Sequence, residues 1–140
     1  IDTYDADWNY TGQQSTNLGT TNLSFSPGIV ASSTITVKPV KSLAIYLNSK
    51  YVGKQYIDNT SNDARSLGGY FVNGSGISYT IQTKLFREIG FSLALNNLFS
   101  VKYETNAWVY PYLQNNQYYE ANGYFPQALA NFLVGISLKL

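Results

Sequence analysis

Apolar and polar residues alternate with a period of two over five long stretches of this 140-residue chain. Such alternation is typical of β-strands that have one apolar face and one polar face. The predicted strands cover residues 28–38, 42–56, 69–82, 90–100 and 128–140. The sequence therefore predicts an all-β fold, built as an antiparallel up-and-down meander of about five long strands.

Each predicted strand divides its residues between two faces, because successive side chains of a strand point in opposite directions. One phase of each strand is apolar, and the other contains Ser, Thr, Asn, Gly and Lys. The residues predicted for the apolar face are Leu43, Ile45, Leu47, Phe91, Leu93, Leu95, Phe132, Val134 and Ile136. Those predicted for the polar face are Thr34, Thr36, Asn48, Lys50, Ser92 and Asn96.

The predicted connections alternate between short and long. Residues 38–42 and 83–89 form short turns, whereas the run up to residue 27 and the segments 57–67 and 103–127 are predicted to be long loops. Outer-membrane barrels show this asymmetry, with short periplasmic turns and long extracellular loops. A soluble β-sandwich predicts the same period-two pattern, with the apolar face buried against a second sheet. A small passive pore or adhesin barrel is a third interpretation.

The composition excludes several kinds of chemistry. The chain has no His and no Cys, which removes the usual general base, the thiol nucleophile and most metal ligands. A net charge of +1 gives no reason to expect nucleic acid as a partner. Asp2, Asp5 and Asp7 offer oxygen ligands for Ca²⁺, but their spacing fits a solvated loop better. We expect no catalysis and no cofactor. Because the chain starts at Ile1 and lacks Met, we also expect a cut or processed N-terminus.

The segment 103–127 is rich in aromatic residues spaced by Asn, Gln and Gly. Flat amphipathic rings of this kind stack on sugars, ring-bearing chelators or peptides. An interfacial aromatic girdle is the alternative interpretation. The candidate ligand-binding residues are Trp108, Tyr110, Tyr112, Tyr118 and Tyr119.

Four segments resemble the end of the barrel of TonB-dependent outer-membrane receptors of the type found in Bacteroidetes-like bacteria. They are TNLSFSPGIVASSTITVKP (21–39), SKYVGKQYIDNTSNDARSLGGYFVN (49–73), LFREIGFSLALNNLFSVKYE (85–104) and YFPQALANFLVGISLKL (124–140). They follow the order of that family and cover most of the chain. The stretch NNLFSVKYE (96–104) carries the most specific part of the resemblance.

The last residues resemble the signal that the barrel-assembly machinery reads in that family. Gly135 stands five places before the end, and Leu138 and Leu140 occupy the third-last and last places. The family usually ends on Phe or Trp, so Leu140 departs from the pattern, and this departure puts the efficiency of assembly in doubt.

The resemblance implies a fragment of a larger protein. The complete receptor would be a 22-stranded barrel with an N-terminal plug domain, and residues 1–140 would be the C-terminal part of that barrel. It would import a scarce ligand, such as a siderophore, haem, cobalamin, a glycan or a peptide, with energy delivered through TonB. Its implied partners are outer-membrane lipid, the rest of the barrel, the plug domain, TonB and the barrel-assembly machinery.

Overall fold

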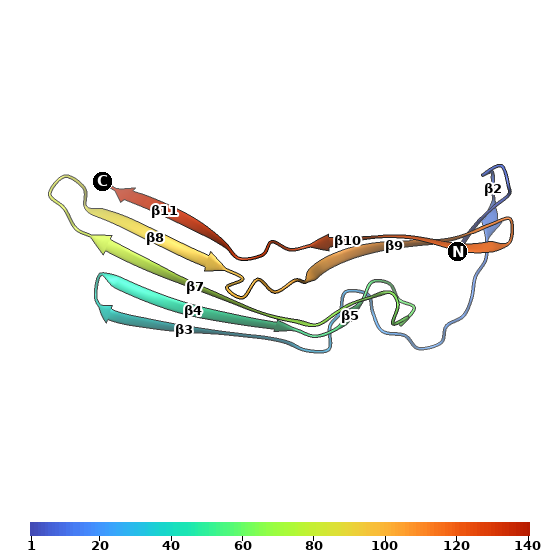
Figure 1. Ribbon diagram of the computed structural model, residues 1–140, viewed down its shortest axis with the longest axis horizontal. Coiled ribbons are helices and arrows are strands. Elements are labelled where there is room, and N and C mark those ends of the chain that lie inside the picture. The colour runs from blue at the N-terminus through green and yellow to red at the C-terminus, as the bar shows by residue number, and fades with distance from the viewer. The chain divides into compact units, whose positions relative to one another are not determined.

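The computed structural model describes all 140 residues and contains eleven β-strands (Figure 1). None of its segments forms a helix with the length and apolar character needed to cross a membrane. The chain divides into two compact units. We call them the hairpin unit (residues 1–28, 54–68 and 104–126) and the sheet unit (residues 29–53, 69–103 and 127–140). The all-β fold class is as predicted.

The sheet unit is a five-stranded antiparallel sheet in the order β11-β8-β7-β4-β3, and it confirms the predicted meander of long strands. Its strands are 9–12 residues long. Each pairs with the strand that precedes or follows it within the unit. The strands are β3 (Val30–Val40), β4 (Leu43–Val52), β7 (Tyr70–Ile81), β8 (Glu88–Asn96) and β11 (Asn131–Lys139).

Two short connections join strands at one end of this sheet. Lys41 and Ser42 alone connect β3 to β4, because β3 continues to Val40 through a bulge over Lys38 and Pro39. A bulge suits Pro39, which has no backbone N–H to donate to a neighbouring strand. Residues 82–87 connect β7 to β8. The short turns predicted at 38–42 and 83–89 are therefore present, with slightly different bounds.

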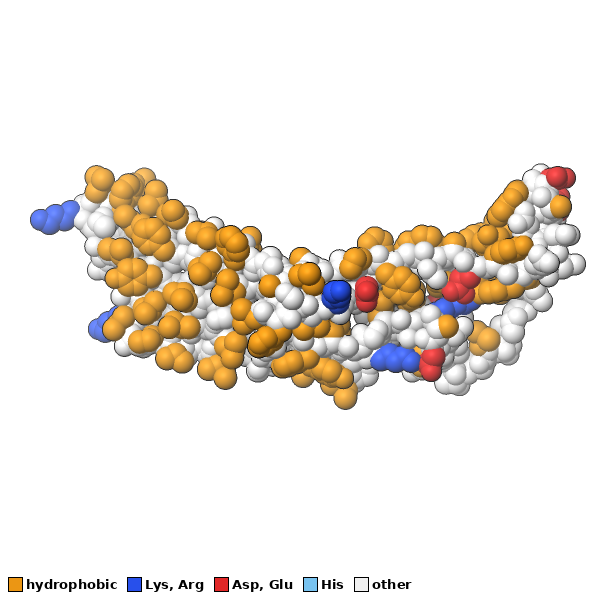
Figure 2. All heavy atoms as spheres, viewed as in Figure 1, with side chains coloured by type: hydrophobic (Ala, Val, Ile, Leu, Met, Phe, Trp, Pro, Cys, Tyr) orange, Lys and Arg blue, Asp and Glu red, His pale blue; other side chains and the backbone are white.

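The strand register confirms the two predicted faces. One row across the sheet contains Val37, Ile45, Ile77, Leu93 and Val134, which occupy paired positions on the five strands. Two flanking rows contain the other predicted apolar residues in the same phase. Leu47, Leu95 and Phe132 lie in one of them, and Leu43, Phe91 and Ile136 lie in the other. These apolar side chains are partly or largely exposed, because no second layer of the sheet unit covers them. Figure 2 shows hydrophobic side chains spread over this sheet.

The polar face is packed closely around glycines of β7. A Cβ built on Gly76 would lie 2.4 Å from the Tyr46 ring, and one built on Gly74 would lie 2.4 Å from Asn48 Oδ1. The side chains of β4 therefore lie flat over β7 at these two positions. Any larger residue in place of either glycine would push them aside, so the close approach requires glycine there.

Strand β8 ends at Asn96 rather than at the predicted residue 100, because Asn97 begins a tight corner. Asn97 has a φ of 47° and is buried. Its amide donates to the carbonyl oxygens of Val101 (2.9 Å) and Ala128 (3.0 Å), and its Oδ1 accepts from Val101 N–H at 2.9 Å. One side chain thus satisfies three backbone groups and fixes the connection that follows β8.

The hairpin unit contains a four-stranded sheet in the order β10-β9-β1-β2 and a small two-stranded pair, β5 and β6. Strand β1 runs parallel to β9, and the other pairs are antiparallel. The strands are β1 (Asp2–Tyr4), β2 (Tyr10–Gln13), β5 (Gln55–Tyr56), β6 (Ser66–Leu67), β9 (Glu104–Gln114) and β10 (Gln117–Pro126).

The prediction of a long loop over 103–127 was wrong. This segment forms a regular β-hairpin, in which β9 and β10 are joined by Asn115 and Asn116 alone. The two Asn residues have φ angles of 49° and 61°, the left-handed conformation that a tight type I′ hairpin turn requires and that Asn tolerates. The predicted loops up to residue 27 and over 57–67 also contain short strands: β1 and β2 lie in the first, and β6 lies in the second.

A small apolar core holds the hairpin unit together. Ile57, Leu67 and Ala107 are buried and contact one another, and Val109 packs against them. Leu67 is the most buried of these side chains, at 1% exposure. The segment 57–67, which the sequence indicated as a polar loop, therefore supplies two of the core residues.

Candidate ligand-binding face

Strand β9 places three of the five predicted binding residues on one face of the hairpin. Trp108, Tyr110 and Tyr112 alternate with smaller residues along the strand and share one phase. Across the register, Tyr112 faces Tyr119 on β10, which brings a fourth predicted residue to the same face. The rings of Tyr112 and Tyr119 are stacked, with their centroids 5.5 Å apart and their planes at 17°. We call this surface the aromatic face.

The N-terminal segment adds three aromatic residues to the aromatic face, which the sequence analysis missed. Tyr112 lies at the centre, with the rings of Tyr4 (6.4 Å), Trp8 (5.5 Å) and Tyr110 (5.9 Å) around it. Tyr10 packs edge-on against Tyr4 at 5.9 Å. Their close spacing in the segment YDADWNY (4–10) was the available signal, but the parallel pairing of β1 with β9 joins residues more than a hundred positions apart and has no local signature.

A hydrogen-bonded chain fixes the polar edge of the aromatic face. The Tyr110 hydroxyl donates a hydrogen bond to Asp2 Oδ2 at 2.8 Å. Its only proton is used there, so the Tyr110 oxygen accepts the hydrogen bond that joins it to the Tyr4 hydroxyl, also at 2.8 Å. The hydrogen-bonded contacts with Tyr4 and with Asp2 raise the pKa of Tyr110 above its ordinary value. The hydrogen bonds from Gln13 and Tyr110 lower the pKa of Asp2. Asp2 therefore stays ionised and orients two tyrosine hydroxyls.

Trp108 lies flat on the backbone of the neighbouring strand. A Cβ built on Gly123, its partner in the register, would be 2.4 Å from the indole Nε1. Gly123 thus creates the space for the indole ring, and the ring remains about half exposed to the surroundings. A ring held in one orientation and open on its other side can stack on a ligand with little further loss of conformational freedom.

Tyr118 does not join the other four predicted residues. It has the opposite phase on β10, the same as Glu120, and its hydroxyl donates to Glu120 Oε2 at 2.8 Å. Arg65 also contacts the Tyr118 hydroxyl. The structure therefore places Tyr118 beside a buried cation on the other face of the hairpin, because a two-residue turn fixes the phase of β10 relative to β9.

Arg65 is the centre of a charged network on that second face. Its side chain is 9% exposed, and its guanidinium contacts Asp58 Oδ2 at 2.8 Å and Glu120 Oε2 at 2.7 Å. Burial opposes the ionisation of Asp58, but hydrogen bonds from Thr60 and Arg65 outweigh it and hold the pKa of Asp58 below its ordinary value. Burial likewise opposes ionisation of Glu120, and the hydrogen bonds from Tyr118 and Arg65 lower its pKa overall.

Asp2 and Asp5, two of the three acidic residues near the N-terminus, make separate sets of hydrogen bonds. Asp5 Oδ1 accepts from the backbone N–H groups of Asp7 and Asn9, both at 2.9 Å, and so caps the turn between β1 and β2. Asp2 is hydrogen-bonded to Gln13 and Tyr110 instead. No group of three or more acidic side chains comes together as it would around a metal ion.

The residues predicted to form the assembly signal lie in the sheet unit. Gly135 is paired with Ser92, whose hydroxyl occupies the space where a Cβ would be, 2.6 Å away. Leu138 pairs with Ile89 and continues the apolar face of β11, and Leu140 follows the strand and is almost fully exposed. The contact with Ser92 therefore gives a packing reason for glycine at position 135, and this reason does not depend on an assembly signal.

The sequence matches no protein-family model and none of the curated proteins with which it was compared.

Proposed function

We propose that this chain is the terminal part of a TonB-dependent outer-membrane receptor, whose sheet unit lies in the wall of a 22-stranded barrel. The observation that carries the proposal is the uncovered apolar face of the sheet unit. Val37 and Val134, at the two edges of the sheet, are 55% and 69% exposed. Each such side chain gains about 1.5–3 kcal/mol when it leaves water, so a face of this size requires an apolar surrounding.

The dimensions of the apolar face favour hydrocarbon over a protein partner. From Phe71 to Ile81, strand β7 rises about 34 Å at ~3.4 Å per residue, or about 24 Å at a ~45° tilt. Outer-membrane barrels have an apolar band about 25 Å tall. No Asp, Glu, Lys or Arg occupies the apolar phase of any of the five strands.

Aromatic pairs lie near both limits of this band. Tyr51 pairs with Phe71 towards one limit, and Tyr79 pairs with Phe91 towards the other. Membrane barrels carry aromatic girdles of this kind at the two lipid–water interfaces. The opposite face, with Asn48, Gly74 and the other small or polar residues, suits a wet lumen.

A charge placed on each face tests this orientation. In the complete receptor, Val37→Arg should destabilise the folded protein in lipid vesicles by about 2–4 kcal/mol, because the charge would enter hydrocarbon. The neighbouring substitution Thr36→Arg points to the polar face and should change the stability by less than about 0.5 kcal/mol. Urea titrations in vesicles measure both. Equal effects of the two substitutions would contradict the proposal.

The aromatic face is the proposed ligand contact of this receptor, and the class of ligand is open among siderophore, haem, cobalamin, glycan and peptide. The support is the cluster around Tyr112, whose ring contacts four others, together with the half-exposed indole of Trp108. The alternative of a soluble binding module for carbohydrate or protein would use the same face. It would require a covering layer over the apolar face of the sheet unit.

Calorimetric titration of the complete receptor tests the ligand contact. The probes are a ferric catecholate siderophore, haemin, cyanocobalamin, an oligosaccharide and a short peptide, each added separately. For the probe that binds, Tyr112→Ala should weaken the affinity by about three- to tenfold, the value of one aromatic contact. Tyr124→Ala, on the opposite face of β10, should leave it unchanged. Loss of affinity only in the Tyr124 variant would place the contact elsewhere.

A further inference from the structure

Positive charge is concentrated at one end of the sheet unit, the end that carries its two short connections. Five of the nine basic residues of the chain lie there, and Glu88 is the one acidic side chain among them. All five basic side chains are exposed, and none takes part in an ion pair. They are Lys38, Lys41, Lys84, Arg87 and Lys139.

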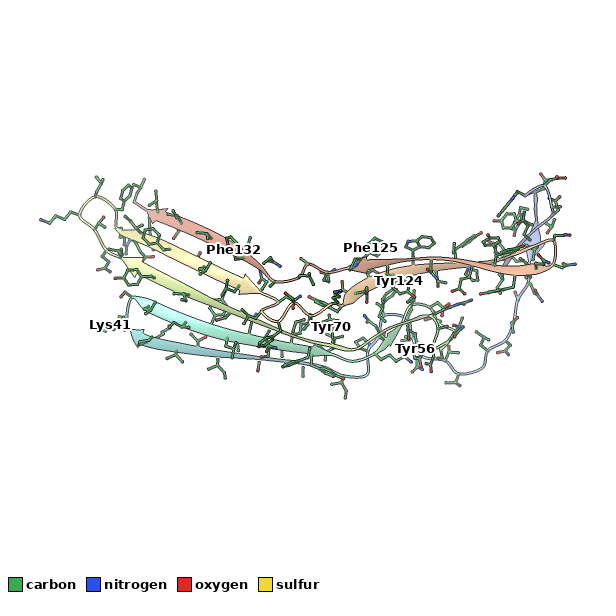
Figure 3. All side chains as sticks on the ribbon, in the orientation of Figure 1. Lys41, Tyr56, Tyr70, Tyr124, Phe125 and Phe132 are labelled. Carbon is green, nitrogen blue, oxygen red and sulfur yellow. The ribbon has the colours of Figure 1, made fainter.

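Three of these cations extend from the turns themselves. Lys41 lies in the two-residue connection between β3 and β4, where Figure 3 labels it. Lys84 and Arg87 lie in the connection between β7 and β8. On the side of the molecule drawn in Figure 2, blue side chains and no red ones appear at this end of the sheet.

The connection between β7 and β8 also presents an apolar side chain between its two cations. Leu85 is 81% exposed. The turn is held by Thr83, whose Oγ1 accepts from Phe86 N–H at 2.9 Å and donates to the Phe86 carbonyl at 3.0 Å. A closed turn that exposes Leu between Lys and Arg is suited to a boundary where hydrocarbon meets negative charge.

The apolar face extends up to this cationic border. Its last row contains Ile81, Ile89 and Leu138, which are paired across three strands. The three turn cations therefore follow directly after the apolar band. In a bilayer, the groups that lie at that height are lipid phosphates, and Lys and Arg side chains are long enough to reach them while their methylene groups stay in the apolar layer.

We propose that the short-turn end of the sheet unit binds the headgroups of anionic phospholipids in the leaflet that it reaches, through Lys41, Lys84 and Arg87 with Leu85 as an apolar anchor. This inference rests on the proposed function, because it requires the sheet to span a bilayer. It adds a lipid preference that the fold alone does not require. Near an anionic surface, each cation favours association by about fivefold.

The test uses the complete receptor in vesicles of phosphatidylcholine, with a bimane fluorophore on a single cysteine at Ser42→Cys. The chain itself contains no cysteine that would compete for the label. A small fraction of either phosphatidylglycerol or phosphatidylcholine carries a nitroxide high on its acyl chain, and quenching of bimane reports how often that lipid is nearby. Phosphatidylglycerol should quench severalfold more efficiently than phosphatidylcholine.

A matched pair of variants isolates the cations. Lys41→Gln with Lys84→Gln should remove most of the preference for phosphatidylglycerol, whereas Lys50→Gln with Lys102→Gln removes the same number of lysines from other parts of the sheet unit and should leave it intact. Salt at about 0.5 M should also suppress the preference of the unaltered protein, since the Debye length then falls to about 4 Å. Equal quenching by the two lipids, or a preference that survives the first variant, would overturn the inference.

A second label separates this failure from a failure of the proposed function. Bimane at Val134→Cys lies on the apolar face and should be quenched by both nitroxide lipids alike. Quenching there without any preference at Ser42 would leave the receptor proposal standing and reject the headgroup site. Absence of quenching at both positions would reject both proposals.

Discussion

The hairpin unit and the sheet unit consist of similar strands but obtain their stability in different ways. In the hairpin unit, side chains find partners within the chain: Leu67 is buried in a small core, and Arg65 is paired with two carboxylates. In the sheet unit, hydrogen bonds join the strands, but no second layer of that unit packs on the apolar face of the sheet. The hairpin unit therefore carries a side-chain core of its own, whereas the apolar face of the sheet unit has no covering layer within that unit.

The largest expected difference in stability between the two units follows from the removal of Arg65. Arg65→Ala leaves Asp58 and Glu120 partly buried without their cation, and should cost the hairpin unit about 3 kcal/mol. Hydrogen exchange of the amides of Ile57 and Leu67 measures this loss. The amides of β4 and β7 should keep their protection. Equal loss of protection in the two units would show that Arg65 does not stabilise the hairpin unit alone.

Lys54 provides the control for that experiment. Its ion pair with Asp63 is also short, at 2.5 Å, but the two side chains are 45% and 79% exposed. Ion pairs this exposed contribute little to stability, so Lys54→Ala should change the protection of the hairpin unit little.

A smaller effect is expected on acidification. The folded-state pKa values of Asp58 and Glu120 are lower than the ordinary values of 3.8 and 4.5. Their contribution to stability is therefore present above those ordinary values and is lost as the pH falls below them, through the lowered folded-state pKa values. Exchange rates corrected for intrinsic pH dependence should rise in the hairpin unit below about pH 4. This rise in exchange rate should be absent in the Arg65→Ala variant. If the rise persists in that variant, titration of groups other than Asp58 and Glu120 causes it.

The smallest effect concerns the turn between β9 and β10. Asn116 has a φ of 61°, which glycine adopts without strain. Asn116→Gly should therefore stabilise the hairpin by about 0.5 kcal/mol, and Asn116→Val should destabilise it by about 1–2 kcal/mol. Amide exchange along β9 and β10 detects both changes. A stabilising Val substitution would mean that the turn is not of the type I′ kind.

The sequence predicted the sheet unit well because each of its strands carries a complete local signal. In β8, for example, Phe91, Leu93 and Leu95 alternate with small or polar residues, and this period-two pattern alone determines the strand and its two faces. The bulge at Lys38 and Pro39 was not predicted, because a proline at the end of an alternating run indicates a turn just as well.

The hairpin unit was predicted poorly for physical reasons that its residues illustrate. The Asn, Gln and Gly residues between the aromatic ones indicated a loop over 103–127, although this segment forms β9 and β10, with Pro111 inside β9. The parallel pairing of β1 with β9 depends on contacts between distant residues. Tyr118 was assigned to the ligand-binding set by its proximity in sequence, whereas the hairpin register places it on the other face, beside Arg65.

Two neighbouring residues of β11 test most directly which face of the sheet unit meets hydrocarbon. Val134 and Leu133 are both apolar and similarly exposed, at 69% and 65%, yet they point to opposite faces of the sheet. With the protein reconstituted into lipid bilayers, a nitroxide on Val134→Cys should collide mainly with dissolved oxygen, which concentrates in hydrocarbon. A nitroxide on Leu133→Cys should collide mainly with a water-soluble nickel chelate. Preferential collision of both labels with the nickel chelate would show that the Val134 face of the sheet unit does not meet hydrocarbon.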